Sequence, residues 1–422
     1  MLTKIKNNIN NINLLINILG FFALVMLVIF SPNNLVYDEG FHQFQVELLN
    51  EYGLSMRFLQ GSDESAPGPT YAIIHYLFQS LTNLEAPQIR IINVVLLLVI
   101  ILIIKNIASL LDYQNSWNLS FSIMSIPFIW PVSGMALTEI PAMFFACLGV
   151  YFLLLGMKND TNKVAFSSVF LGGFLFSFAI LGRQTFLLIL FCLPFLIITF
   201  NQNFNINQLI KSINKKQILT ILLFIIPSLI LPIIQFIIWG GLVPSGQKAI
   251  GSGYSLIHFF LSLAYGGVGM FLLTPNWFNL KSKIYLQIVI ITGGINLIFG
   301  WVEIIPFSSL AKKVLPNIFV IIYGRFTSSL LMSIGVIFII STVVNIWKNR
   351  NNQTFSFFAF AILLSLFGFG KITHLFSSRY VTTIVPFMIL ASPIYYCNNF
   401  SKILLTITGN ILGFFSLYSY FI

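Results

Sequence analysis

Charged residues are scarce in this chain, which holds 22 Lys and Arg and 11 Asp and Glu among its 422 residues, or 8%. Soluble domains carry about 25% charged residues, so the sequence excludes an ordinary globular protein. Cysteine is scarce as well. Cys147, Cys192 and Cys397 all lie within apolar runs, where cysteine behaves as a small hydrophobic residue. We therefore expect neither a disulfide framework nor a zinc cluster.

Apolar residues are abundant: 57% of the chain is hydrophobic and the mean hydropathy is +0.92. Runs of roughly 17 to 25 apolar residues are long enough to cross a bilayer as helices. Such runs occur near residues 13–31, 88–110, 116–133, 139–157, 164–181, 184–200, 217–239, 255–274, 284–302, 317–345, 354–370, 380–397 and 403–421. The sequence predicts an all-α integral membrane protein of about 13 spans, with a range of 11 to 13. We expect residues 1–422 to form a single transmembrane domain.

The first apolar run follows Lys4 and Lys6, is too long for a cleaved signal sequence and lacks a small-residue cleavage site. We expect it to be a retained first helix that begins in the cytoplasm. With that orientation the inner segments hold thirteen bases and two acids, and the outer segments hold nine of each. The whole net charge of +11 then lies inside, as membrane proteins require. The basic character consequently indicates topology and lipid headgroups, with no nucleic-acid partner.

Acidic residues gather in the predicted first outer loop, residues 32–87. Seven of the eleven lie there: Asp38, Glu39, Glu47, Glu51, Asp63, Glu64 and Glu85. Long acidic loops between spans are uncommon and often functional. We interpret this loop as an outer catalytic loop that serves as an active-site lid or substrate platform.

The loop opens with a helical pattern from Asp38. Phe41, Phe44, Leu48 and Tyr52 form one apolar stripe, and Asp38, His42 and Gln45 form an adjoining polar stripe. We expect an interfacial helix whose aromatic face contacts the membrane boundary and whose carboxylates face water. Asp38 is then either a helix N-cap on a solvated surface or a general base with raised basicity beside the bilayer. Asp38 with His42 is also a possible, though poorly supported, divalent-metal pair.

A second segment of the loop reads Pro67-Gly68-Pro69-Thr70-Tyr71 and continues as an apolar stretch to Leu84. The Pro-Gly-Pro turn predicts a short helix from Tyr71 that is too short to cross a bilayer comfortably. We expect it to lie at or partly in the outer leaflet.

Charges also occur at the predicted outer ends of spans. Glu139 opens the fourth span, and Arg183, in Arg183-Gln184-Thr185, lies between two apolar runs. An arginine in a membrane costs roughly 2.5 to 3.5 kcal/mol even on lenient scales, so it needs a partner, water or a ligand. Snorkelling at the interface is the alternative for both residues.

The remaining cationic candidates lie later in the chain. Lys248 ends a glycine-rich loop that could clamp phosphate but lacks the Gly-Lys-Ser/Thr ending of a P-loop. His374, Arg379 and Tyr380 follow the eleventh predicted span, where they are either phosphate donors or an interfacial belt. The four histidines have no metal-ligand spacing, so we expect no metal site.

Three motifs in order resemble a known family. They are Asp38-Glu39-x-Phe41-His42-x-x-Gln45, Pro67-Gly68-x-Thr70-Tyr71 and Arg183-Gln184-Thr185, with a later Arg379-Tyr380. An Asp-Glu pair after the first span, a long first outer loop and a Pro-Gly-x-x-Tyr helix resemble the GT-C glycosyltransferases, which use polyprenyl-phosphate sugars. The sequence is most similar to the alpha-1,2-glucosyltransferases that add the terminal glucose to lipid-linked oligosaccharide. Phe186 stands where that family usually has asparagine.

The resemblance implies an inverting hexosyl transfer on the outer side of the membrane. Asp38 would be the base, and Glu39 and His42 would orient the base or the acceptor. Arg183 and Arg379 would stabilise the departing lipid phosphate, with Lys248 and His374 as weaker candidates. The other residues expected to bind substrate are Gln45, Tyr71, Glu139, Gln184 and Tyr380.

The implied partners are a polyprenyl-phosphate sugar donor, a glycan, lipid or protein hydroxyl acceptor, and the lipid bilayer. No cofactor is inferred, and a divalent metal is possible without support. We expect a bacterial plasma membrane protein with a cytoplasmic N-terminus. A lipid-linked saccharide flippase or solute transporter is the alternative, although the chain shows neither an internal repeat nor charges near the midplane of its spans.

Overall fold

The computed structural model describes residues 2–62, 66–158, 162–198, 215–248, 253–303, 305, 308–395 and 400–422. Asp63, Glu64 and Cys397 lie outside these ranges. Every regular element in the described residues is a helix, which confirms the all-α prediction. Within these ranges, ten helices are long and apolar enough to cross a membrane: α1 (Leu2–Ile29), α6 (Gln88–Leu110), α9 (Glu139–Lys158), α10 (Asn162–Gly182), α13 (Lys215–Trp239), α14 (Leu256–Leu273), α15 to α16 (Ser282–Phe299), α18 (Asn317–Lys348), α19 (Gln353–Gly368) and α22 (Phe400–Phe421).

The other three predicted spans are broken into short pieces. The run near 116–133 forms α7 (Ser116–Phe121), η1 (Ser122–Ser125) and α8 (Ile129–Gly134). The run near 184–200 forms η2 (Gln184–Phe186), α11 (Leu187–Leu190) and η3 (Leu193–Leu196). The run near 380–397 forms α20 (Arg379–Thr382), α21 (Val385–Ala391) and η8 (Ser392–Tyr395). Each run contains proline, which lacks the N–H that a continuous helix needs, but proline alone does not break a run, because α13 stays continuous with Pro227 and Pro232 inside it. Irregular backbone at membrane depth requires cover from protein, and all of α8 and α21 is buried.

The outside of the bundle is apolar. Ile237 on α13 is 74% exposed, and Ile318 at the start of α18 is 65% exposed. Large apolar side chains in such numbers on the surface of long helices are stable only in contact with lipid. The chain is therefore an integral membrane protein.

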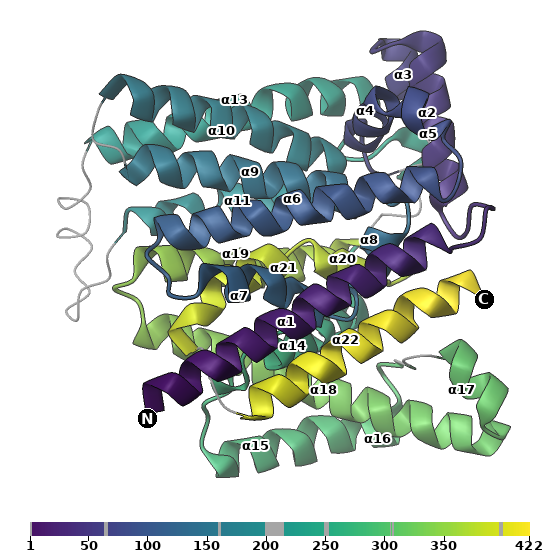
Figure 1. Cartoon of the computed structure of the whole chain (residues 1–422), viewed down its shortest axis with the longest axis vertical. Coiled ribbons are helices and arrows are strands. Elements are labelled where there is room, and N and C mark those ends of the chain that lie inside the picture. Colours follow the sequence, from purple (N-terminus) through teal and green to yellow (C-terminus); the bar gives the residue numbers. More distant parts are fainter. Residues whose placement is uncertain are drawn as a thin grey trace.

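The predicted first outer loop folds into four short helices at one end of the bundle. They are α2 (Glu39–Tyr52), α3 (Met56–Gly61), α4 (Thr70–Leu77) and α5 (Gln79–Thr82). Figure 1 shows them together at the right, and we call this end of the bundle the capped end. The expected helix from Tyr71 to Leu84 is thus two helices, α4 and α5, because the chain leaves helical geometry at Phe78.

The two termini lie at opposite ends of the bundle. The N-terminal end of α1 is far from the capped end, and the C-terminal end of α22 lies at it (Figure 1). Between them α9 packs against α6 and α10, α10 packs against α13, and α1 packs against α22. At the capped end α4 contacts α2, α9 and α10, whereas α20 contacts α8 and α9. The first loop and the C-terminal third of the chain therefore meet around the start of α9.

Candidate active site

Asp38 and Arg379 form an ion pair at the capped end. Asp38 is the residue before α2 and has no side-chain bond to that helix, so its carboxylate does not cap the helix. Instead Oδ2 lies 2.6 Å from Nη1 of Arg379, the first residue of α20. The Asp38 side chain is 31% exposed and the Arg379 side chain 16%. The carboxylate is therefore both charge-paired and reachable from outside.

Glu139 joins two arginines below this pair. Its side chain is fully buried at the first position of α9, where a negative charge also suits the positive end of the helix. Nη2 of Arg183 donates to Oε1 of Glu139, and Nε of Arg379 lies 3.6 Å from the same oxygen. We call Asp38, Glu139, Arg183 and Arg379 the ion cluster. Its two acids and two bases sum to zero charge.

The ion cluster has unused bonding capacity and aromatic walls. Nε of Arg183 and Oε2 of Glu139 have no hydrogen-bond partner within the part of the chain that the structure describes. The Tyr380 ring lies 5.7 Å from the Arg183 guanidinium and 5.4 Å from that of Arg379, and Tyr37 is 5.4 Å from Arg379. Aromatic faces stabilise guanidinium groups without occupying their N–H donors. The arginines thus remain able to bind an anion.

The second and third sequence motifs pack directly against each other. The Gly68 N–H donates to the Leu181 carbonyl at 2.8 Å, and Nε2 of Gln184 donates to the Ala66 carbonyl at 2.5 Å. Thr70 Oγ1 donates to the Phe178 carbonyl at 2.6 Å. A Cβ on residue 68 would collide with that Leu181 oxygen, so the close approach requires glycine. The Pro-Gly-Pro turn therefore anchors the loop to the backbone that carries Arg183.

The polar stripe of α2 faces inward, which makes the expected orientation of this helix wrong in part. Glu39, His42 and Gln45 are buried, while Phe41 and Phe44 are more than half exposed. The aromatic residues thus do face outward, as expected. Glu39 is the carboxylate that does not face water. The reason is that the same face carries Val46 and Leu49, which pack in an apolar cluster with Tyr71 and Ile89, and that Arg90 of α6 pairs with Glu39.

His42, Tyr71 and His75 form a buried aromatic column beside the ion cluster. The ring centroids of His42 and Tyr71 are 5.2 Å apart, and those of Tyr71 and His75 are 4.0 Å apart. Burial, and then the nearby positive charges of Arg183 and Arg379, hold the pKa of His42 well below its ordinary value. Burial lowers the pKa of His75 to about 3 and raises that of Tyr71. All three rings are neutral at pH 7.

Neutral His42 and Gln45 can act as hydrogen-bonding groups but not as cations. Both ring nitrogens of His42 and Oε1 of Gln45 lack a partner among the described residues. Asp38 is occupied by Arg379 and not by His42. No group of three or more His, Cys, Asp or Glu that could hold a metal ion occurs in the described ranges.

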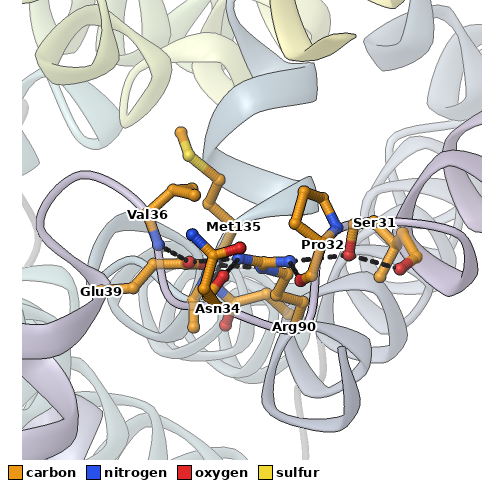
Figure 2. Close-up of polar contacts among 10 residues, drawn as sticks. Ser31, Pro32, Asn34, Val36, Glu39, Arg90 and Met135 are labelled. Carbon is orange, nitrogen blue, oxygen red and sulfur yellow. Dashed lines mark hydrogen bonds and ion pairs between the residues drawn. The ribbon is translucent and has the colours of Figure 1, made fainter. Parts of the chain in front are cut away.

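Glu39, the neighbour of Asp38, is held by Arg90 and by backbone groups (Figure 2). Nε and Nη2 of Arg90, on α6, donate to its two carboxylate oxygens at 2.8 and 2.7 Å. The same oxygens accept from the backbone N–H groups of Ala136 and Val36, both at 2.8 Å. Both side chains of the Glu39 and Arg90 pair are fully buried. Glu39 therefore has every oxygen satisfied and none available to a substrate.

Arg90 also fixes the chain between α1 and α2. Nη1 donates to Ser31 Oγ and to the Pro32 carbonyl, both at 2.7 Å, and Nη2 donates to the Asn34 carbonyl at 2.8 Å. We call Arg90 with its partners Ser31, Pro32, Asn34 and Glu39 the Arg90 clamp; Figure 2 shows its side chain at the centre of them. The end of α22 closes this region, with the Phe421 ring 4.9 Å from Arg90 and the Tyr420 ring 5.6 Å from that of Tyr37.

The two weaker candidates have different surroundings. His374 is exposed, and partial burial of its ring and then the charge of Arg379 lower its pKa. Lys248 is exposed and donates to the Gly240 carbonyl of its own loop at 3.0 Å. The structure thus brings Asp38, Glu139, Arg183, Arg379 and Tyr380 together. Lys248 has no observed contact with them.

Sequence reasoning missed Arg90 and Tyr37 as components of the site. Arg90 is three residues into an otherwise apolar span, immediately after the acidic loop. A charge in the first turn of a span requires a partner, and the nearby acids were available to supply it. That signal was present in the sequence, but it did not identify Glu39 as the acid.

No protein-family model and no curated protein matches the chain. Two solved structures are similar to it, both of ArnT from Cupriavidus metallidurans. The structure bound to undecaprenyl phosphate has 13% identity and a TM-score of 0.41, covering 94% of this chain and 76% of that chain. The apo structure has 11% identity and a TM-score of 0.42, covering 96% and 77%. A likeness this distant assigns neither a family nor a substrate.

Proposed function

We propose that the chain is a membrane glycosyltransferase that moves a sugar from a polyprenyl-phosphate donor to an acceptor hydroxyl. The observation that carries the proposal is the ion cluster, in which the partly exposed Asp38 carboxylate lies 2.6 Å from an arginine that a second arginine accompanies. Transfer from a lipid phosphate needs a base for the hydroxyl and cations for the leaving phosphate. The cluster offers both at one end of an apolar bundle.

In the proposed reaction Asp38 accepts the proton of the acceptor hydroxyl while that oxygen attacks the anomeric carbon. The bond from this carbon to the phosphate oxygen breaks, and the electron pair leaves with the lipid phosphate. Arg183 and Arg379 donate to the phosphate oxygens as their charge grows. Attack opposite the leaving group inverts the anomeric configuration. The lipid chain stays in contact with the apolar helices, so only the sugar and phosphate enter the polar site.

Glu139 keeps the two guanidinium groups aligned until the donor arrives. The donor phosphate then competes with Asp38 for Arg379, which frees the carboxylate to act as a base. Neutral His42, Gln45 and Tyr71 keep unpartnered but buried polar atoms, so they bind hydroxyl groups of the sugar only once donor entry exposes them. His374 and Tyr380 line the same region, and Gln184 holds the turn beside Arg183. Glu39 orients Asp38 through the Arg90 clamp and does not itself transfer a proton.

We infer the sugar and the compartment from the sequence resemblance. It favours glucose as the transferred hexose and an inverting mechanism. The distribution of lysine and arginine favours a capped end on the outer side of the membrane, which we infer to be a bacterial plasma membrane.

The test is transfer by the purified chain in lipid nanodiscs. Polyprenyl-phosphate glucose, mannose and aminoarabinose, each radiolabelled, are supplied with neutral oligosaccharide, lipid and peptide acceptors. We expect label to move from donor to acceptor in the native chain and not in Asp38→Asn. Absence of transfer from every donor contradicts the proposal. In proteoliposomes, movement of intact labelled donor across the bilayer without transfer would identify a flippase instead.

A further inference from the structure

A cleft of about 420 Å³ opens beside the Arg90 clamp at the capped end. Its walls are Asn33, Leu35, Gln43 and the segment 84–88. These residues come from the chain between α1 and α2, from α2, and from the turn before α6. The cleft is therefore built by the same segments that carry Asp38 and Arg90, but it is separate from the ion cluster.

The Arg90 clamp makes one wall of this cleft rigid. Arg90 binds the carbonyls of Pro32 and Asn34, and Glu39 accepts from the Val36 N–H. The backbone groups of Pro32, Asn34 and Val36 thus hydrogen-bond to the Arg90 clamp, as Figure 2 shows. The intervening residues, Asn33 and Leu35, line the cleft. A wall fixed by buried charge-assisted bonds needs little ordering when a ligand binds.

The lining is suited to a neutral, polyhydroxylated ligand. Asn33, Gln43 and Gln88 contribute carboxamides, each with donors and acceptors, and Glu85 contributes a carboxylate acceptor. Sugar hydroxyls are also both donors and acceptors, so amide side chains match them. No cation belongs to the lining among the described residues, in contrast to the ion cluster. The cleft therefore suits a neutral glycan and not a phosphate group.

The cleft lies within a short distance of Asp38 along the chain. Leu35 is three residues before Asp38, so their Cα atoms are at most ~11 Å apart. Gln43 is five residues after Asp38, about 7.5 Å along the axis of α2. Five helical residues also turn about 140°, so Gln43 and Asp38 lie on different sides of α2, and a short oligosaccharide held in the cleft must pass around the start of α2 to reach the carboxylate.

We propose that this cleft binds the acceptor, and that the acceptor is a neutral oligosaccharide. The role of the bound glycan as acceptor rests on the proposed function, whereas the binding of a glycan in the cleft does not depend on it. The donor phosphate and the acceptor glycan then approach Asp38 from different sides, the first through the arginines and the second through the carboxamides. The Arg90 clamp holds the cleft wall and the segment that carries Asp38 in fixed positions relative to each other.

The first experiment measures binding without turnover. Asn33→Cys is introduced into a full-length chain whose three native cysteines are alanine, and its labelling by a water-soluble maleimide is followed in nanodiscs. The probes are maltotriose, cellotriose, mannotriose and chitotriose, with a serine-containing peptide and polyprenyl phosphate as alternatives. We expect at least one trisaccharide to slow labelling fivefold or more. Protection by the peptide or lipid phosphate instead, or by none of the probes, overturns the proposal.

The second experiment uses the chain with its native cysteines and measures transfer. Asn33→Ala with Gln43→Ala should raise the acceptor KM at least tenfold, while kcat falls no more than threefold and the donor KM is unchanged. Asn50→Ala, which removes an exposed amide elsewhere on α2, is the matched control. If transfer occurs and the acceptor KM does not change, the cleft assignment fails and the function stands. If trisaccharides slow labelling of the Asn33→Cys variant but no donor supports transfer, the proposed function fails and glycan binding stands.

Discussion

Asp38 and Glu39 are adjacent in the chain and each pairs with an arginine, but their surroundings differ. The Glu39 and Arg90 side chains are fully buried, and each carboxylate oxygen of Glu39 accepts two hydrogen bonds. The Asp38 side chain is 31% exposed and contacts one guanidinium. The first pair is saturated and can only hold structure, whereas the second retains capacity to exchange a partner. Adjacent carboxylates in one chain can thus differ completely in burial and in the number of hydrogen bonds that they accept.

The largest effect is expected when the charge of Asp38 is removed. Asp38→Asn should lower the transfer rate about 10²- to 10⁴-fold, the usual contribution of a general base. Stability should change by less than about 1 kcal/mol, because the ion pair is partly exposed. Initial rates and the thermal midpoint in nanodiscs check both parts. A variant with near-native turnover would remove Asp38 from the reaction.

Removing the positive charge of the buried Glu39–Arg90 pair should instead mainly lower the stability of the protein. Arg90→Met should destabilise the protein by about 3 to 5 kcal/mol, because it leaves Glu39 buried without its counter-charge. Thermal unfolding in detergent measures the change. Arg57→Met is the control: Arg57 is exposed and lies over the Tyr52 ring, so the expected change is within about 0.5 kcal/mol. Equal midpoints for the two variants would show that the Arg90 clamp is not structural.

Arg379→Lys tests whether Arg379 can exchange its Asp38 partner for the donor phosphate. Lysine keeps the charge but loses the two-pronged donor, so kcat/KM for the lipid-phosphate donor should fall about 10- to 100-fold, the value of a charge-assisted hydrogen bond. Arg325→Lys, at an exposed position on α18, should leave it unchanged. An Arg379→Lys variant with native donor kinetics would assign the phosphate to other residues.

The smallest expected effect concerns pH. His75 has a pKa of about 3 in the folded protein against 6.5 when exposed, so below pH 6.5 the unfolded chain binds a proton that the folded chain does not. Stability therefore rises with pH through this window and is lost as pH falls. The loss attributable to His75 should be about 1 kcal/mol between pH 7 and 5.5. His75→Asn should flatten the pH dependence of the thermal midpoint; an unchanged slope would contradict it.

The sequence predicted the spans and most of the ion cluster for clear physical reasons. A run of apolar residues has to cross the bilayer, and ten of the predicted runs are single helices. Asp38, Glu139, Arg183 and Arg379 were conspicuous because a charge at the end of a span is costly without a partner. The structure shows that they are partners of one another.

What the sequence could not predict depends on contacts between distant segments. Periodicity identified α2 and its two stripes, but the rotation of the helix is set by what packs against it, namely the apolar cluster around Val46 and Leu49 and the Arg90 side chain. Glu39 is buried because Arg90, 51 residues later, reaches it. The broken runs were indistinguishable from spans by hydropathy. Their prolines did not distinguish them either, because α13 keeps Pro227 and Pro232 inside a continuous helix. The protein cover that makes a broken helix tolerable comes from neighbouring segments.

The packing of Tyr420 against Tyr37 has a practical consequence for locating the site relative to the two faces of the membrane. It ties the last turn of the chain to the residue before Asp38, so both occupy the same aqueous compartment. A topology reporter fused after Ile422 therefore reads out the compartment of the Asp38 carboxylate without substituting any residue near it. Because the first turn of α1 lies at the far end of the bundle, a second reporter fused there should give the opposite signal.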